Sequence, residues 1–389
     1  MSRIIYADHA ATTALSPAAL EAMTPYLTQQ YGNPSSLYRF GQQAKAGLED
    51  ARTRIAACLG AEADEVYFTS GGTEADNWAI RGVLEAQAKK GNHVITSAIE
   101  HHAVLHTLDA LARQGLCQVT QVGVDAQGRV NPEEVRAALR PDTVLISIMA
   151  ANNEIGTIEP VAEIGAIARQ AGVLFHTDAV QAVGHIPVQV NDWKVDLLSL
   201  SGHKFHGPRG IGALYVRKPL RLPPLIFGGG QEKGRRSGTE YVAGAVGMAA
   251  ALQEAVGQME TEGRRLSALR DRLIDGILSQ VPRSSLTGPR ENRLPGTASF
   301  VFACVEGESI LLRLDSRGVC ASSGSACSSA SLDPSHVLLS IGLPHEVAHG
   351  SLRLSLGRET TAEDVDDLLT IIPEVVAGLR AMSPLWCEN

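Results

Sequence analysis

Short apolar runs alternate with longer amphipathic stretches between residues 66 and 200, and this alternation limits the possible folds most strongly. The spacing predicts β-strands over 66–69, 93–96, 119–122, 143–148, 173–176 and 195–200. Between the strands it predicts helices over 74–86, 103–114 and 164–171. Strands joined by helical crossovers lie parallel. We therefore expect an α/β fold whose mostly parallel sheet is covered by helices on both faces.

The chain before this alternation is expected to be largely helical. Ser16 and Pro17 form a good cap and first turn for one helix. Residues 42–59 are amphipathic and predict a second, longer helix that ends at Gly60.

The chain after the alternation predicts a second, smaller unit. A long helix over about 245–278 leads to a mixture of helices with strands at 299–302 and 352–355, as in an α+β domain. A chain of 389 residues is also too long for one small core. We therefore expect two domains, a large one over 14–256 and a small one formed by 1–13 and 257–389.

Composition excludes several classes of partner. The net charge is −8 and no basic stripe is visible, which argues against direct binding of nucleic acid. The apolar runs are too short for a membrane span and residues 1–5 lead into no signal-peptide core, so we expect no membrane association and a cytoplasmic protein. Six scattered cysteines without a CxxC pair favour reduced thiols, so a special cysteine is expected to be reactive rather than structural.

One lysine stands at a sharp turn directly after a predicted strand. Residues 201–208 read Ser-Gly-His-Lys-Phe-His-Gly-Pro, so glycines and a proline bracket Lys204. Ligands of open α/β sheets bind at strand ends, and a lysine that is partly desolvated there can act as a nucleophile. On this stretch alone, Lys204 could equally be a surface lysine.

Two other strand ends carry polar residues that suit an anionic, ring-containing ligand. Gly71, Gly72 and Thr73 lie between a predicted strand and a predicted helix, where backbone N–H groups can bind phosphate. The same residues are also typical of an ordinary tight turn that binds no ligand. Asp178 ends the strand at 173–177 and could pair with a protonated ring nitrogen, with Gln181 donating nearby; an ordinary helix cap is the alternative. Together with a Schiff-base lysine, these features match the binding constellation of pyridoxal phosphate.

Histidines at the start of the helix at 103–114 allow two interpretations. His102 and His106 lie four residues apart on one helix face, with Asp109 continuing it, so a zinc site is a rival hypothesis. No third ligand converges elsewhere in the sequence. His101, at the helix start, is better placed to stack on a flat ring at the strand ends.

The remaining stretches with chemical potential lie later in the chain. Residues 228–239 are glycine-rich and basic and could either close over an anion, with Thr239 donating to it, or form a surface loop. Residues 320–331 are almost all small and polar, which predicts a flexible loop with an exposed, reactive Cys327, whereas Cys320 is expected to be buried and inert. Arg353 alternates with apolar residues and could be a solvated residue or a carboxylate clamp.

Taken together, these segments resemble the cysteine desulfurases of the NifS/IscS type, a branch of the class-V aminotransferase family. The matching stretches follow the family's order over nearly the whole chain; they are 6–13, 32–36, 69–77, 152–156, 176–181, 201–204, 235–239, 323–327, 334–338 and 355–358. One departure is His9-Ala10-Ala11, where an asparagine pair often stands, and we expect little consequence.

The resemblance implies a fold and a role for each matching residue. The fold would be that of pyridoxal phosphate-dependent transferases of fold type I, with a seven-stranded-type sheet in the large domain. Lys204 would hold the cofactor as an aldimine. Asp178 would pair with the ring nitrogen of the cofactor, and Gln181 would pair with its ring oxygen. His101 would stack on the ring. The phosphate would be held by Gly72, Thr73, Ser201 and His203, and by Thr239 of the second subunit of a homodimer. The substrate amino acid would be bound by Asn153, which also contacts the cofactor, and by Arg353 through its carboxylate.

The resemblance also implies the reaction. Cys327 would take sulfur from L-cysteine as a persulfide and leave L-alanine, with Lys204 and His101 as the other catalytic residues. A separate scaffold or other sulfur-acceptor protein would receive the sulfur for iron–sulfur cluster assembly, and tRNA thiolation is an open second destination. No intrinsic metal site is implied, although Cys327 as a transient iron–sulfur ligand with a scaffold stays open. The alternatives are a selenocysteine lyase, a class-V aminotransferase that would not need Cys327, and, more remotely, a non-catalytic carrier built on Cys327, His102 and His106.

Overall fold

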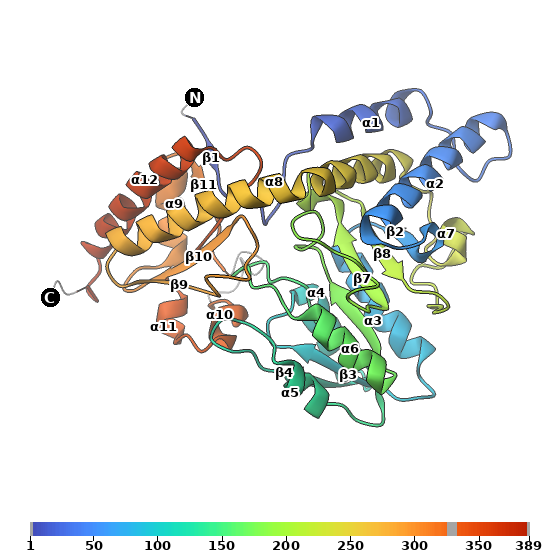
Figure 1. The fold of residues 1–389 in the computed structure, drawn as a ribbon, viewed down its shortest axis with the longest axis horizontal. Helices are drawn as coiled ribbons and strands as arrows, with labels where there is room; N and C mark the ends of the chain where they lie inside the picture. The colour runs from blue at the N-terminus through green and yellow to red at the C-terminus, as the bar shows by residue number, and fades with distance from the viewer. Residues whose placement is uncertain (1–2, 325–332, 387–389) are drawn as a thin grey trace.

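The structure is a computed structural model that describes residues 3–324 and 333–386. It consists of two layered parts that lie at opposite ends of one long helix, α8 (Val242–Gln280), as Figure 1 shows. The predicted Cys327 and the rest of 325–332 lie outside the described residues.

The larger part is built on a seven-stranded sheet with the order β2-β8-β7-β6-β5-β3-β4. Five adjacent strands of this sheet run parallel to one another: β7 (Leu197–Ser201), β6 (Leu174–Asp178), β5 (Thr143–Ser147), β3 (His93–Ser97) and β4 (Gln118–Val122). At one edge, β8 (Gly212–Val216) pairs antiparallel with both β7 and β2 (Val66–Thr69). The predicted α/β fold with a mostly parallel sheet is confirmed.

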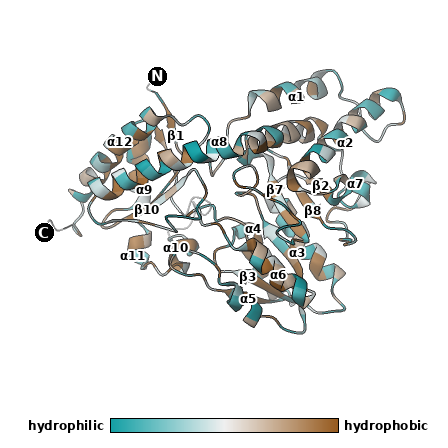
Figure 2. Cartoon of the chain, viewed as in Figure 1, coloured by the Kyte–Doolittle hydropathy of each residue, from teal (hydrophilic) through white to brown (hydrophobic). Residues whose placement is uncertain are grey.

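Side chains alternate between the two faces of this sheet, and each face has its own helices. Phe68, Phe175 and Leu198 pack into one core with α2 (Arg39–Leu59), α6 (Val161–Ala171) and the first half of α8. On the opposite face, Tyr67 and Leu197 pack with α3 (Gly72–Ala86) and α4 (His102–Arg113). Both faces are buried, which explains why the parallel strands read as continuous apolar runs. Figure 2 shows these apolar strands as brown arrows between the helices.

The smaller part contains a three-stranded antiparallel sheet of order β12-β10-β9. Its strands are β9 (Ser284–Leu286), β10 (Thr297–Phe302) and β12 (Ser351–Ser355). The apolar side chains of this sheet pack against the second half of α8, α9 (Gly307–Asp315) and α12 (Ala362–Arg380). Shorter elements complete the described fold: β1 (Ile5–Tyr6), β11 (Val319–Cys320), α1 (Pro17–Thr28), η1 (Ala63–Glu65), α5 (Pro132–Ala137), η2 (Gly202–Lys204), α7 (Gln231–Gly234), α10 (His336–Ser340) and α11 (His345–Ala348).

The expected domain boundaries at 13/14 and 256/257 stay a prediction. Two observations bear on them: β1 pairs with β11 in the smaller part, and the core residues of α8 fall into one group before residue 253 and another after residue 265. None of the described helices combines the length and apolar character that a membrane span requires.

Candidate active site

A cavity of about 850 Å³ opens at the carboxyl ends of the central parallel strands. Ten of the predicted site residues line it: Gly72, Thr73, His101, Asn153, Asp178, Gln181, Ser201, His203, Lys204 and Arg353. They come from segments up to 281 positions apart in the sequence (353 − 72 = 281). The fold therefore brings together residues that the sequence suggested separately.

Lys204 projects into this cavity from the turn after β7. Its Nζ donates to the carbonyl oxygens of Ala10 and Ala11, at 2.7 and 2.9 Å. The turn closes through Gly207, whose N–H donates to the Gly202 carbonyl at 2.9 Å. A Cβ on Gly207 would lie 2.7 Å from that oxygen, so the tight turn requires glycine at this position. The amine thus lies between the N-terminal segment and the strand ends.

Asp178, the last residue of β6, places a buried carboxylate in the cavity. Its Oδ1 accepts a hydrogen bond from the Val180 N–H at 2.9 Å. Burial raises the pKa of Asp178, while His101 and Lys204 oppose this shift. A cationic ring nitrogen would therefore be a favourable partner for it. Gln181 lies beside it, with its Nε2 donating to the Ala10 carbonyl at 3.0 Å.

His101 caps the N-terminus of α4 at the wall of the cavity. Its Nδ1 accepts from the Ala103 N–H at 3.1 Å, so any proton on the neutral ring is on Nε2. Burial is the main cause of its lowered pKa, although Asp178 acts in the opposite direction. A neutral, fixed imidazole suits stacking against a flat ligand.

The N-terminus of α3 forms another wall. Gly72 and Thr73 are its first residues, and both line the cavity. The backbone N–H groups in the first turn of a helix have no partner within the helix, so this end of the cavity favours an anion. A Cβ on Gly72 would lie 2.6 Å from the Val180 side chain, which explains the glycine. His203 accompanies Ser201 here, and burial lowers the pKa of His203 to about 4. This wall suits a phosphate group.

Arg353 enters from β12 of the smaller part and is 4% exposed. One terminal nitrogen pairs with Asp8 at 2.8 Å and the other donates to the Asn153 carbonyl at 3.0 Å. Its Nε is buried and has no hydrogen-bond partner among the described residues. A buried guanidinium with an unused N–H in a cavity fits the carboxylate of an amino acid.

These residues fit pyridoxal phosphate on structural grounds. The cavity contains a buried carboxylate for a ring nitrogen, a helix N-terminus for a phosphate and a lysine between them. Among the described residues, two buried polar atoms of residues that line it, Asp76 Oδ1 and Arg353 Nε, have no hydrogen-bond partner, and such atoms are found at functional sites.

Two predicted site residues are not brought to this cavity. Thr239 is exposed and lines a separate cavity of about 420 Å³ with Ser70 and Arg236. Cys327 lies outside the described residues, so its predicted position stays untested. The prediction for Cys320 was partly wrong: it is half-buried in β11, because that two-residue strand lies at the edge of its small sheet.

The zinc hypothesis finds little geometric support in the described part of the chain. The rings of His102 and His106 stack with centroids 4.5 Å apart, and His336 lies 4.8 Å from His102. The His336 Nε2 already pairs with the Glu100 carbonyl at 3.0 Å. Among the described residues, ligand atoms converge only at Asp76, His101 and Asp178, which belong to the cavity already described.

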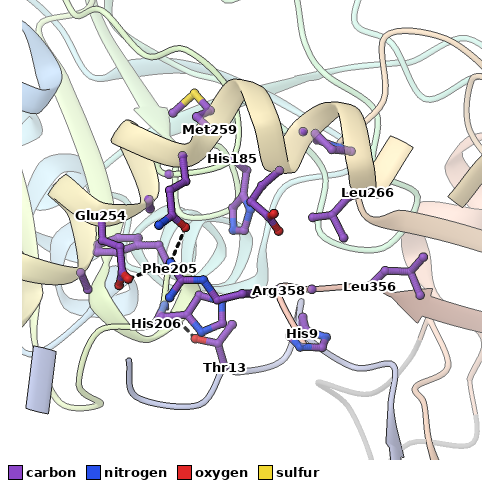
Figure 3. Close-up of a pocket in the computed structure, with 18 residues that line it drawn as sticks. His9, Thr13, His185, Phe205, His206, Glu254, Met259, Leu266, Leu356 and Arg358 are labelled. Atoms are coloured by element: carbon purple, nitrogen blue, oxygen red, sulfur yellow. Dashed lines mark hydrogen bonds and ion pairs between the residues drawn. The ribbon is translucent and has the colours of Figure 1, made fainter. Parts of the chain in front are cut away.

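A second cavity, of about 640 Å³, lies beside α8, which contributes Glu254, Met259 and Leu266 to its lining (Figure 3). Phe205 and His206 separate it from Lys204, and Glu254 and Arg358 form an ion pair of 2.9 Å in its wall. His185 lines it and its Nε2 hydrogen-bonds to the Lys204 carbonyl at 3.0 Å. Because burial lowers the pKa of His185 to about 4, the ring is a neutral donor that supports the turn.

Sequence reasoning missed several residues of the first cavity. Asp76, Met149 and the carbonyls of Ala10 and Ala11 contribute to its lining, and Asp8 pairs with Arg353. Of these residues, only Asp76 could have been found from the sequence, because it lies one helical turn after Thr73 and therefore on the same helix face. The Asp8–Arg353 pair joins residues 345 positions apart, which no local pattern shows.

Comparisons with known proteins agree with this geometry. Residues 5–368 match the family described as Aminotransferase class-V. The chain therefore belongs to the class-V aminotransferase family.

Its relatives within that family are more specific. The chain is 52% identical to a protein named cysteine desulfurase IscS from Clostridium botulinum (strain Hall), over 99% of this chain and 98% of that one. It is 54% identical to a cysteine desulfurase IscS from Methanosarcina thermophila, over 99% of this chain and 95% of the other. The predicted resemblance to cysteine desulfurases of the NifS/IscS type is confirmed.

Solved structures give the same result for the fold. A NifS-like protein superposes with a TM-score of 0.91 at 38% identity, covering 97% of this chain and all of the other. A structure described as SspA in complex with cysteine superposes with a TM-score of 0.81 at 36% identity, covering 90% of this chain and 98% of that one. The pyridoxal phosphate-dependent transferase fold is thereby confirmed.

Proposed function

We propose that this protein is a cysteine desulfurase that converts L-cysteine to L-alanine and keeps the sulfur as a persulfide on Cys327. The observation that carries the proposal is the convergence of Lys204, Asp178, His101 and Arg353 on one cavity at the strand ends. The relatives named above, which share about half of their residues with this chain over its whole length, support the same activity.

Pyridoxal 5′-phosphate is the cofactor of this family. We assign its ring nitrogen to Asp178, its ring oxygen to Gln181 and its phosphate to Gly72, Thr73, Ser201 and His203. When bound, the cofactor supplies an electron sink for bonds that break at the substrate Cα. His101 would stack on its ring face, and Lys204 would hold it covalently.

The chain's own residues orient the substrate and move protons. The Arg353 guanidinium and Asn153 would fix the substrate carboxylate, which points the amino group toward Lys204. Once freed, the Lys204 amine can take and return a proton, with its position set by the carbonyls of Ala10 and Ala11. The Cys327 thiolate would bond to the substrate sulfur as the Cβ–S bond breaks and the carbon gains a proton. The overall reaction balances as cysteine plus thiol giving alanine plus persulfide.

We further propose that the enzyme works as a homodimer in which Thr239 serves the partner's cavity. Thr239 is exposed and does not line the cavity of its own chain. Large apolar side chains are also exposed in the turn between α1 and α2 and in the segment that precedes α7; they are Tyr31, Leu37, Tyr38 and Phe227. Exposed apolar groups of this size are typical of an interface between chains.

The destination of the sulfur and the location of the enzyme are part of the same proposal. We propose that the persulfide on Cys327 is passed to a separate acceptor protein and that iron–sulfur cluster assembly is its destination. The described cysteines, Cys58, Cys117, Cys304 and Cys320, are all free, which supports a reducing compartment such as the cytoplasm.

The test is an assay with L-cysteine and a reductant in which alanine and sulfide are measured together with the visible absorbance of the bound cofactor. Cys327→Ser should keep the absorbance and reduce sulfide release to background, because the sulfur acceptor is lost. Cys320→Ser is the matched control and should release sulfide at the normal rate. Normal sulfide release by Cys327→Ser would refute the proposed mechanism.

A further inference from the structure

Asp76 is a buried acid of the cavity that the reaction described above does not use. It lies in the second turn of α3, is 1% exposed and lines the same cavity as Asp178. Within the part of the chain that the structure describes, its Oδ1 has no hydrogen-bond partner, although it lies 3.6 Å from the His176 Nε2. Acidic oxygens of Asp76 and Asp178 and a nitrogen of His101 all lie within 4.8 Å of one another. Two buried carboxyl groups therefore share one small space.

Two carboxylates this close and this buried cannot both be ionised without a large cost in free energy. Asp178 is the better site for the charge. It accepts the Val180 N–H, and both His101 and Lys204 favour its charged form. Asp76 has no such cation. Burial raises its pKa well above the usual range, and the charge of Asp178 raises it further.

The other titratable groups around Asp76 do not change this distribution. His176 is completely buried between the hydroxyls of Ser147 and Ser199, at 2.9 and 3.0 Å, and burial lowers its pKa to about 3, so it is neutral. Glu100 precedes α4, and burial raises its pKa strongly as well. The groups that face Asp76 are thus Asp178 and His176 from β6, and His101 and Glu100 from the segment before α4.

We propose that Asp76 is a positioning residue that works as a neutral carboxylic acid, so that Asp178 alone carries the negative charge of the pair. The inference rests on the proposed function, because it assigns Asp178 to the ring nitrogen of the cofactor. A neutral Asp76 is a hydrogen-bond donor as well as an acceptor, and it can hold the Asp178 carboxylate in place without competing for the ring's positive charge. An ionised Asp76 would compete for that charge.

The experiment compares Asp76→Asn with Asp76→Ala in the holoenzyme. The amide of Asn is uncharged and nearly isosteric with a protonated acid, so Asp76→Asn should keep the wild-type cofactor affinity and the wild-type pH midpoint of the visible absorbance. Asp76→Ala removes the polar group that would hold the Asp178 carboxylate, so it should weaken cofactor binding by about tenfold and shift the midpoint. If Asp76→Asn shifts the midpoint as Asp76→Ala does, or if neither variant differs from wild type, the proposal is wrong.

An infrared difference spectrum tests the protonation state without relying on activity. Wild type minus Asp76→Asn at neutral pH should show the carbonyl band of a protonated carboxyl group; a carboxylate band in its place would overturn the proposal. This measurement needs only folded protein, so it stays informative if Asp76→Ala does not fold. It also distinguishes the two proposals. If the wild-type protein does not bind the cofactor, the proposed function is wrong, but the infrared result on the protonation of Asp76 still holds.

Discussion

At the scale of single residues, the site depends on charged groups whose partners come from distant parts of the chain. Arg353 is held by Asp8 from the N-terminal segment and by the Asn153 carbonyl from the larger part, while its buried Nε has no hydrogen-bond partner among the described residues. The planar guanidinium can satisfy all three directions at once, and an ammonium group cannot.

We therefore predict that Arg353→Lys raises the KM for L-cysteine by about 10- to 100-fold, since one charge-assisted hydrogen bond to the carboxylate is lost. The visible absorbance of the bound cofactor should stay close to that of the wild type. Steady-state kinetics checks the prediction, with the exposed Arg313→Lys on α9 as the matched control. An unchanged KM would show that another group binds the carboxylate.

Single residues also mark how far the sequence could predict the site. Lys204, Asp178 and the turn at Gly72 were found because each directly follows a predicted strand, and strand ends in α/β sheets meet at one edge. Asp76 and Asp8 were not assigned a role, because their function depends on which residues the fold places opposite them. A short stretch of sequence does not show whether a residue will be buried or which distant residue it will pair with.

At the scale of elements, the expected strands and helices of the parallel region formed within a few residues of their predicted ends. The strand β8 was missed because an antiparallel neighbour needs no helical crossover, so it did not belong to the alternation that revealed the others. The sequence also did not predict the short helix α7 that follows β8. An ion pair with α2 holds α7 in place, and local helix preference does not.

This ion pair joins Arg52 of α2 to Glu232 of α7, and both side chains are 3% exposed. The two guanidinium nitrogens donate to the two carboxylate oxygens at 2.7 and 2.8 Å, and the Phe68 N–H donates to one of them at 2.9 Å. Glu232 itself has a positive φ of 46°. The pair therefore holds a strained backbone segment against β2.

We predict that Glu232→Gln lowers the free energy of unfolding by about 3–5 kcal/mol, because Arg52 loses its buried partner and keeps only the exposed carboxylate of Glu49. Urea denaturation measures this change. The matched control is Glu49→Gln, which removes the exposed second partner of Arg52 and should cost less than about 1 kcal/mol. Equal effects of the two substitutions would contradict the prediction.

At the scale of the whole molecule, the proposed homodimer predicts that each active site needs residues from both subunits. If Thr239 serves the partner's cavity, each complete site takes Lys204 from one subunit and Thr239 from the other. Lys204 and Arg353 line the cavity of one chain and should act together within it.

Co-expression of Lys204→Ala subunits with Thr239→Val subunits should therefore restore activity, since the mixed dimer contains one site with both wild-type residues. Lys204→Ala with Arg353→Ala should restore none, because every site then lacks one of the two. Sulfide release per mixed dimer, isolated with two affinity tags, measures the outcome. Failure of the first pair to exceed the second would place Thr239 in its own subunit's site.

The helix α8 runs without a break through both parts, and its 39 residues rise by roughly 1.5 Å each. Lys204 belongs to the part packed on its first half and Arg353 to the part packed on its second half. Inserting one residue into the stretch 256–264, where no side chain belongs to either core, would turn the two halves by about 100° relative to each other. The length of this stretch therefore sets the orientation of the part that carries Arg353 relative to the part that carries Lys204.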